Sequence, residues 1–238
     1  MSENAEITNV KIVLIGESGV GKTCIVSRFV SDMFDANSPS TNGASYAAKT
    51  IYFEEHKVNL QMQLWDTAGQ EKFRSIARMF YKDATAAILV YDITRKESYD
   101  EMTKYWYKEL LENAPDDVII GIAANKADLY TQEQVPETEA REFAQKIGAI
   151  FRNTSAMTAG GIEELFIGIG KKLLDPNYRD DAIASDEGTS DPKPIGGSKM
   201  NNQRDTIKLE PNNNKQEKKK KKCCGGGKEG ERTKSEEK

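Results

Sequence analysis

Cysteine and histidine are nearly absent from this chain of 238 residues, which contains three cysteines and one histidine. Cys24 stands alone and Cys223 is adjacent to Cys224, so no spacing typical of a disulfide framework or a zinc site occurs. We expect Cys24 to be a small core residue on a helix. His56 lies in the polar stretch FEEHKVN, which predicts a turn rather than a catalytic centre.

Long hydrophobic runs are also missing. No stretch approaches the roughly 18 apolar residues of a membrane-spanning helix, and residues 1–10 are polar and include acids, unlike a signal peptide. We therefore expect the folded part to work in the cytosol. With 37% hydrophobic residues, the chain can bury one sizeable core and still carry a tail.

Aromatic residues disappear after residue 178, and the composition changes after Pro176 to Gly, Pro, Asn, Ser, Lys and Glu. Such a segment cannot bury enough apolar surface to offset its ordering entropy. The sequence predicts a folded domain over 8–176 and a disordered tail over 177–238. The stretch 215–238 has ten Lys/Arg and five Asp/Glu, so with a net charge of −4 the upstream part carries about −9, and no nucleic-acid partner is expected.

Apolar runs alternate with helix-like segments, which predicts βαβ units and an α/β fold. The expected strands are 10–16, 45–53, 58–65, 86–93, 118–125 and 149–156, and the expected helices are 22–30, 97–113, 137–147 and 162–174. The segments on either side of the EEHK turn read as a hairpin. We expect a mostly parallel six-stranded sheet with one antiparallel edge strand and helices on both faces.

The stretch GESGVGKT at 16–23 fits G-x-x-x-x-G-K-[ST], a loop whose glycines let backbone N–H groups surround a phosphate. Lys22 would reach the β- and γ-phosphates, and the Thr23 hydroxyl would hold Mg²⁺. The expected helix 22–30 would add the partial positive charge of its N-terminus. The motif alone fits many nucleotide-binding enzymes.

Two further motifs follow in order: WDTAGQ at 65–70 and NKAD at 125–128. A carboxylate at Asp128 can accept hydrogen bonds from both N1–H and the 2-amino group of guanine. Adenine lacks that pair of donors and would leave the acid unpaired. The three motifs together predict a protein that binds and hydrolyses GTP.

These motifs, with VYDIT (90–94) and TSA (154–156), resemble those of a Rab-family small GTPase of the Ras superfamily, over about residues 8–175. STNGASY (40–46) is similar to the switch region of the endosomal Rab subgroup. The resemblance implies a G domain and a regulatory GTPase that switches effector binding in vesicle traffic, in the cytosol and on the cytoplasmic face of endosomal or vesicle membranes.

The resemblance also assigns roles. Thr41, nineteen positions after Lys22, would close onto Mg²⁺ and the γ-phosphate, although it could be an ordinary loop residue. Phe34 would abut the guanine or serve as a core ring, and Gln70 would orient the attacking water. The implied catalytic residues are Gln70, Lys22 and Thr41, and the implied metal ligands are Thr23, Thr41 and Asp66. The implied nucleotide-binding residues are Ser18, Gly19, Val20, Gly21, Lys22, Thr23, Cys24, Phe34, Thr41, Gly69, Asn125, Lys126, Asp128, Ser155, Ala156 and Met157.

Partners follow from the same resemblance. No Arg lies between Phe34 and Thr41, so we expect slow intrinsic turnover and acceleration by a GTPase-activating protein. An exchange factor, an escort or GDI-type protein and effectors are also implied. Tyr46, Trp65 and Phe80 align with the aromatic triad that Rab proteins present to effectors, although Trp65 could be a core ring.

The cysteine pair Cys223–Cys224 is expected to carry lipid, next to Lys218–Lys222, which would attract an anionic cytosolic membrane surface. Rab proteins normally end at or within a few residues of such a pair, whereas about fourteen residues (225–238) follow it here. Asn42, Asp83 and Met157 also depart from the family pattern: an aliphatic, a Gly and a Lys, respectively, are usual there.

Two other functions fit parts of the sequence. A small-molecule kinase with a phosphate loop is disfavoured by NKAD and Gln70, and by the lack of an Arg-rich lid. A scaffold that binds nucleotide without hydrolysing it is disfavoured by Lys22, Thr41, Asp66 and Gln70. A single-turnover GTP hydrolysis assay separates these alternatives.

Overall fold

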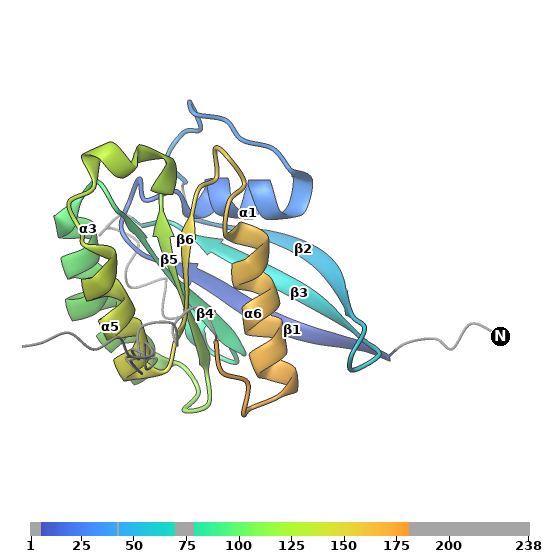
Figure 1. The fold of residues 1–238 in the computed structure, drawn as a ribbon. Helices are drawn as coiled ribbons and strands as arrows, with labels where there is room; N and C mark the ends of the chain where they lie inside the picture. Colours follow the sequence, from blue (N-terminus) through green and yellow to red (C-terminus); the bar gives the residue numbers. More distant parts are fainter. Residues whose placement is uncertain (1–5, 42, 70–78, 181–238) are drawn as a thin grey trace, which may run out of the picture. The chain divides into compact units, whose positions relative to one another are not determined.

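The computed structural model describes residues 6–41, 43–69 and 79–180 (Figure 1). All of them belong to one compact unit, Met1–Ser190, and the second unit, Asp191–Lys238, lies outside the described residues. The elements in chain order are β1 (Glu6–Ile15), α1 (Lys22–Ser31), β2 (Ala44–Phe53), β3 (Val58–Thr67), β4 (Ala86–Asp92), α3 (Lys96–Glu101), η2 (Met102–Trp106), α4 (Tyr107–Asn113), β5 (Ile119–Asn125), η3 (Ala127–Gln132), α5 (Glu137–Ile147), β6 (Ile150–Thr154) and α6 (Ile162–Leu174).

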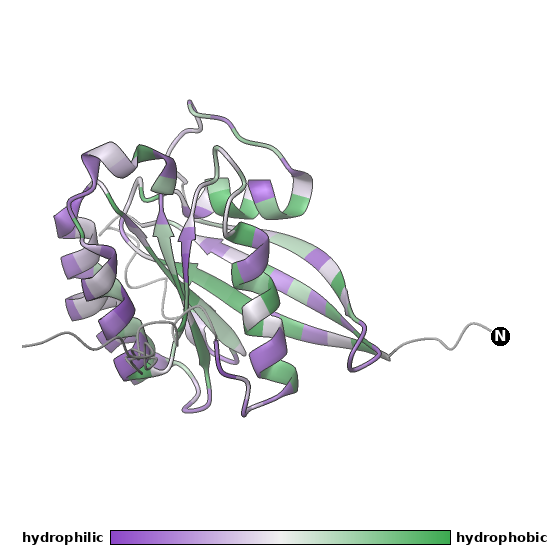
Figure 2. Cartoon of the chain, in the orientation of Figure 1, coloured by the Kyte–Doolittle hydropathy of each residue, from purple (hydrophilic) through white to green (hydrophobic). Residues whose placement is uncertain are grey.

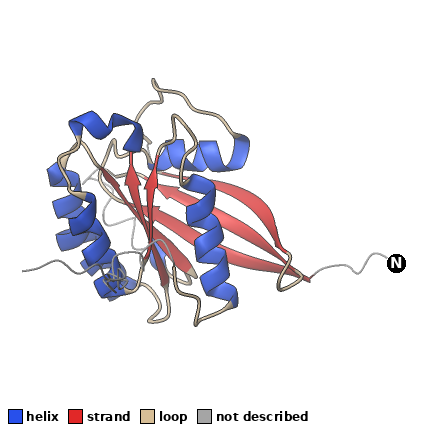
Figure 3. Cartoon of the chain, viewed as in Figure 1, coloured by secondary structure: helices blue, strands red, loops and turns tan. Residues whose placement is uncertain are grey.

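The strands form one six-stranded sheet in the order β2-β3-β1-β4-β5-β6. Only the β2–β3 pair is antiparallel, and β2 is an edge strand (Figure 3). The predicted α/β fold with a single antiparallel edge strand is therefore confirmed. The carboxyl ends of the parallel strands open on one edge of the sheet, where such folds bind ligands.

Each central strand contributes side chains to two cores, one on each face of the sheet. On β1, Ile12 and Leu14 pack on one face with α1 and α6, whereas Val13 and Ile15 pack on the other with α3 and α5. Figure 1 shows these helix pairs on opposite sides of the sheet. Because both faces are covered, the strand needs apolar residues at successive positions. Figure 2 shows the hydrophobic residues gathered on these central strands.

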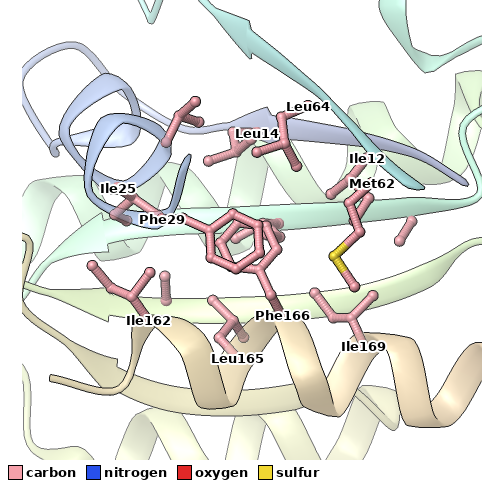
Figure 4. Packing of buried hydrophobic residues seen from close by; sticks show 14 of the residues in the cluster. Ile12, Leu14, Ile25, Phe29, Met62, Leu64, Ile162, Leu165, Phe166 and Ile169 are labelled. Atoms are coloured by element: carbon pink, nitrogen blue, oxygen red, sulfur yellow. The ribbon is translucent and has the colours of Figure 1, made fainter. Parts of the chain in front are cut away.

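The first of these cores is held together by aromatic stacking between two helices. The ring of Phe29 on α1 stacks on that of Phe166 on α6, with centroids 3.7 Å apart (Figure 4). Ile12, Leu64 and Met62 from the sheet surround this pair and are fully buried. This packing fixes α1, and with it the loop that precedes α1, against the sheet.

Three elements differ from the sequence-based expectation, and one of them is the short helix η3, which was not predicted. The strand β1 starts at Glu6 rather than at residue 10, because it pairs with β3 from Glu6↔Val58 onward. Its first residues are polar since this end projects into solvent, where Ile7 is 63% exposed. The predicted helix 97–113 is formed, but a π-helical turn, η2, interrupts it.

The chain folds back against β6 after α6 ends. Arg152 on β6 makes a bidentate ion pair with Asp180, whose side chain also accepts a hydrogen bond from the Phe151 backbone N–H at 3.4 Å. Asp180 is buried by these contacts. The predicted division into 8–176 and 177–238 stays a prediction, and the structure describes four residues of the second range.

Candidate nucleotide-binding site

The phosphate loop lies between β1 and α1, and its glycines are required by its shape. Gly16, Gly19 and Gly21 have φ values of 146°, 78° and 97°. A Cβ on Gly16 would lie 2.2 Å from the Val90 carbonyl oxygen, and one on Gly21 would lie 2.3 Å from Asn125 Nδ2. The loop therefore passes against β4 and β5 at distances that only glycine permits.

The helix α1 begins directly at Lys22, and no side chain caps its N-terminus. Its first backbone N–H groups are therefore available to an anion at the loop. Lys22 is 5% exposed, and its ammonium donates to the carbonyl oxygens of Gly16 at 2.8 Å and Glu17 at 2.9 Å. Burial lowers the pKa of Lys22 to about 8, so a nearby phosphate would stabilise its charged form.

The end of β5 supplies the second part of the site. The Asn125 side chain is buried, and its amide donates to the Val20 carbonyl at 2.7 Å. Thr154 at the end of β6 donates to Asn125 Oδ1 at 3.2 Å. Asn125 therefore ties the phosphate loop to the ends of two strands.

Two contacts orient the groups that follow Asn125. The Ser155 hydroxyl donates to Asp128 Oδ1 at 2.6 Å. Lys126 has a φ of 65° and forms an ion pair with Asp92 Oδ2 at 2.6 Å. Burial alone would raise the pKa of Asp92, but hydrogen bonds from Lys126 and Thr94 hold it below its usual value.

A cluster of oxygen atoms lies where α1, the segment before β2 and the end of β3 meet. The Thr23 hydroxyl donates to Asp66 Oδ2 at 2.6 Å and lies 2.5 Å from the Thr41 hydroxyl. Ser45 Oγ is 3.4 Å from the same carboxylate oxygen. Burial raises the pKa of Asp66, and its Oδ1 is buried with no hydrogen-bond partner among the described residues.

This oxygen cluster fits Mg²⁺. The ion prefers oxygen ligands and usually takes one or two carboxylates, with phosphate and water oxygens completing the octahedron. Within residues 6–41, 43–69 and 79–180, no group of three or more His, Cys, Asp or Glu side chains could hold a metal alone. The donors present therefore suit a cation that is shared with a bound phosphate.

Many of these groups line one cavity of about 520 Å³, whereas Asp66, Asp92 and Ser155 act on its lining residues from outside it. It runs from the phosphate loop to the NKAD segment, a volume suited to a small-molecule ligand. Of the predicted nucleotide-binding residues, those that line this cavity are Ser18, Gly19, Gly21, Lys22, Thr23, Cys24, Phe34, Thr41, Gly69, Asn125, Lys126, Asp128, Ala156 and Met157. Met157 and Phe34 are exposed, and Val20 is buried beneath the loop.

Some predicted residues do not line the cavity or are not described. Asp66 and Ser155 are not lining residues, although Asp66 contacts Thr23 and Ser155 contacts Asp128. Gln70, which was expected to orient the attacking water, and the cysteine pair Cys223–Cys224 lie outside the described residues, as does Asn42. Asp83 has a φ of 59°, which explains why glycine is favoured at this position.

The three aromatic side chains predicted for effector binding lie together, although they come from different elements. The Tyr46 and Trp65 rings are 5.3 Å apart, and those of Trp65 and Phe80 are 5.5 Å apart. Tyr46 is 54% exposed, while Trp65 and Phe80 are half-buried against the core. Trp65 therefore both packs against the core and contributes to this exposed cluster.

Two arginines at the site were not singled out from the sequence. Arg95 donates to the Ser18 carbonyl of the phosphate loop at 3.1 Å and lies 3.4 Å from the Glu17 carboxylate. Arg28 donates to the Ala156 carbonyl at 2.8 Å. The partners are 77 and 128 residues apart in sequence, so no local pattern could have indicated these contacts.

Among the helices of the described segments, none combines the length and the apolar character that a membrane span requires.

Comparison with known proteins identifies the family. The family model described as "Ras family" matches residues 11–175. Rat Ras-related protein Rab-31 is 44% identical over 83% of this chain and 94% of its own length. Human Ras-related protein Rab-22A is 44% identical over 70% of this chain and 84% of its own length. The GTP-binding protein ypt5 of Schizosaccharomyces pombe is 42% identical over 72% of this chain and 81% of its own length.

These matches confirm the family predicted from the motifs, and the Rab-31 and Rab-22A relatives confirm the subgroup predicted from STNGASY. Nothing in them favours the non-hydrolysing alternative. The phosphate loop, the NKAD segment and the cavity between them fit the same conclusion. The chain belongs to the Ras family and is a Rab-type small GTPase, a regulatory protein of membrane traffic that binds GTP and hydrolyses it to GDP.

Proposed function

We propose that the GTP-dependent switch of this protein uses Mg²⁺, held near Thr23, Thr41 and Asp66, and that residues lining the cavity bind the phosphates and the guanine base. The observation that carries the proposal is the contact of Thr23 with both Thr41 and Asp66. It brings the phosphate loop, the segment before β2 and the end of β3 to one point. Loss of the terminal phosphate would release Thr41 from this point, which is how a switch segment senses GTP.

Thr23, Thr41 and Asp66 are the proposed groups around Mg²⁺. The ion, when bound, would neutralise charge on the phosphates. Lys22 would move its ammonium from the two loop carbonyls to the phosphates, and Gly69 would offer its N–H to the γ-phosphate. A Cβ on Gly69 would lie 2.4 Å from the Glu17 carbonyl carbon, a backbone atom, so this position also has to be glycine.

Guanine would lie at the other end of the cavity. Asp128, held by Ser155, would accept from N1–H and the 2-amino group, and the Ala156 N–H would donate to O6. The stem of Lys126 would cover one face of the base while its ammonium pairs with Asp92. Phe34, at the cavity rim, would abut the base at its edge.

Gln70 is the proposed residue that orients the attacking water. Replacing Gln70 with Leu keeps the volume but removes the hydrogen-bonding amide. We expect hydrolysis to slow by about 10²-fold while GTP binding survives. Single-turnover hydrolysis, alone and with an activating protein, measures this effect.

Thr23→Asn is expected to have the opposite effect to Gln70→Leu on the bound nucleotide. It disturbs the Mg²⁺ site at its centre, so the protein should retain GDP or no nucleotide rather than GTP. Unchanged hydrolysis in the Leu variant under both conditions would remove Gln70 from the proposed role.

Effectors are proposed to bind the cluster formed by Tyr46, Trp65 and Phe80 in the GTP state. Trp65→Ala removes the central ring, and we expect it to abolish GTP-dependent capture of effectors, a loss of about 2 kcal/mol or more. Nucleotide affinity should change little. Binding of purified effector to the GTP-loaded protein gives the measurement.

Tyr52→Ala is the matched control, because Tyr52 is 53% exposed on the same strand as Tyr46 but stands outside the cluster. It should bind effectors normally. If Trp65→Ala unfolds the protein or loses nucleotide instead, the ring serves the core alone.

The proposed site of action is the cytoplasmic face of endosomal membranes. Five lysines, Lys218–Lys222, precede Cys223 and Cys224, and each would add about 1 kcal/mol of attraction to an anionic leaflet. One lipid chain binds only marginally, so the second cysteine and the lysines would supply what stable anchoring needs. Residues 225–238 carry four basic and four acidic residues and add no net charge.

We expect Cys223 and Cys224 to carry prenyl groups. Intact-mass analysis of protein taken from its native membranes should show the added mass, with residues 225–238 present or trimmed. A Cys223→Ser and Cys224→Ser double variant should be found in the cytosol. Unmodified cysteines together with an intact 225–238 segment in membrane-derived protein would disprove lipid attachment.

A further inference from the structure

The guanidinium of Arg28 on α1 makes four hydrogen bonds to two separate parts of the chain. Its Nε donates to the Ala156 carbonyl at 2.8 Å, and its Nη2 donates to the Met157 carbonyl at 3.2 Å. Its Nη1 donates to the Asp32 carbonyl at 2.9 Å and to Asp32 Oδ1 at 2.8 Å. The Arg28 side chain is only 16% exposed.

The first two bonds fix a loop that borders the base end of the cavity. The loop follows β6, and its internal bonds run from Ser155 N–H to the Gly160 carbonyl at 2.9 Å and from Thr158 N–H to Ser155 Oγ at 3.1 Å. Arg28 joins this loop to α1. Because its two acceptors are the carbonyls of successive residues, it sets the orientation of the two peptide units that flank Met157, next to the unit that carries the Ala156 N–H.

The other two bonds fix the point where α1 ends. Asp32 has a φ of 53° and is the C-terminal cap of α1, with its N–H directed to the Arg28 and Ser27 carbonyls. The segment that leads to Phe34 and Thr41 starts here. One guanidinium therefore connects the loop after β6 with the start of the segment that leads from α1 to Phe34 and Thr41.

We propose that Arg28 is a positioning residue for guanine recognition, which holds the Ala156 N–H in line with the O6 atom of the base. The proposal rests on the proposed reading of O6 by Ala156. Arg28 does not line the cavity. It acts through the Ala156 and Met157 carbonyls, and a rigid guanidinium suits this task because its donors diverge in a fixed plane.

The test compares Arg28→Met with the wild type for three diphosphates. GDP and inosine diphosphate both carry O6, whereas 6-thioguanosine diphosphate carries a sulfur there, which accepts hydrogen bonds weakly. We expect the variant to lose about 10-fold in affinity for the first two and less than about 3-fold for the third. Competition against a fluorescent guanine nucleotide measures all three.

Two further variants separate the contributions. Asp32→Ala removes only the exposed ion pair and leaves the bonds to the carbonyls, so all three affinities should stay within about 2-fold of the wild type. Arg28→Lys keeps the charge but cannot reach both loop carbonyls and Asp32, and it should behave like Arg28→Met. Full affinity in the Lys variant would contradict the need for guanidinium geometry.

The outcomes distinguish the two proposals. A wild type that prefers GDP to the 6-thio analogue, combined with an equal loss for all three ligands in Arg28→Met, would show that Arg28 only supports the fold. A wild type without that preference would overturn the O6 contact itself, and the role of Arg28 with it. Thermal unfolding of each variant confirms that the folded protein is being compared.

Discussion

Replacement of Asp128 with Asn is expected to weaken GTP binding by about 10²–10⁴-fold and to give a preference for xanthosine triphosphate. The Asp128 carboxylate offers two acceptors, and each hydrogen bond from the base to a charged group contributes about 1.5–3 kcal/mol. An amide offers one acceptor and one donor. The donor matches the extra carbonyl that xanthine carries where guanine has its amino group.

Calorimetry with both nucleotides measures this exchange of specificity. Asp116→Asn is a suitable control, because that residue is an exposed acid on the loop before β5 and has no place in the cavity. Ser155→Ala should give a smaller loss than Asp128→Asn, since it removes only the bond that orients the carboxylate. Equal GTP affinity in the Asn variant and the wild type would remove Asp128 from the base site.

Gly21→Ala is expected to lower nucleotide affinity by on the order of 10³-fold, from about 4 kcal/mol of combined strain and lost contacts. The new Cβ would lie 2.3 Å from Asn125 Nδ2, a buried amide that cannot leave its position without losing its bond to Val20. The φ of 97° adds strain that any side chain would bear. The phosphate loop and the end of β5 would be displaced together.

Gly148→Ala is the matched control for this prediction. Gly148 ends α5 with a φ of 66°, and a Cβ there would meet nothing within 4 Å. It should lower the melting temperature slightly, from about 1 kcal/mol of backbone strain, and leave nucleotide affinity unchanged. Nucleotide dissociation rates for both variants give the comparison, and a Gly21→Ala protein that retains GDP normally would refute the steric argument.

Local patterns were sufficient for most of the fold. Helices α5 and α6 have the predicted boundaries, because Gly148 and the changes of polarity mark where they begin and end. The start of β1 was missed since its first residues are polar and are placed there by pairing with β3. The short helix η3 was missed because none of its residues is buried, and the π-helical turn η2 lies inside the predicted helix 97–113.

The cavity was predictable to the extent that its residues lie in contiguous motifs. Asp128, Lys22 and Thr23 are such residues, and the cavity contains all of them. The contacts of Arg28 and Arg95 were not predictable. Each side chain donates to a backbone carbonyl of a loop remote in sequence. Because every residue has such a carbonyl, the residue types do not indicate the contact.

The hydrogen bond from Asn125 to Val20 has a consequence for nucleotide release. It ties the phosphate loop to the end of β5, where the NKAD segment begins, so we expect the proposed phosphate-binding and base-binding contacts to loosen together. A regulator that displaces the phosphate loop would then pull on Asn125 and weaken the proposed contacts with the base as well. Nucleotide release would not require a partner that surrounds the whole nucleotide.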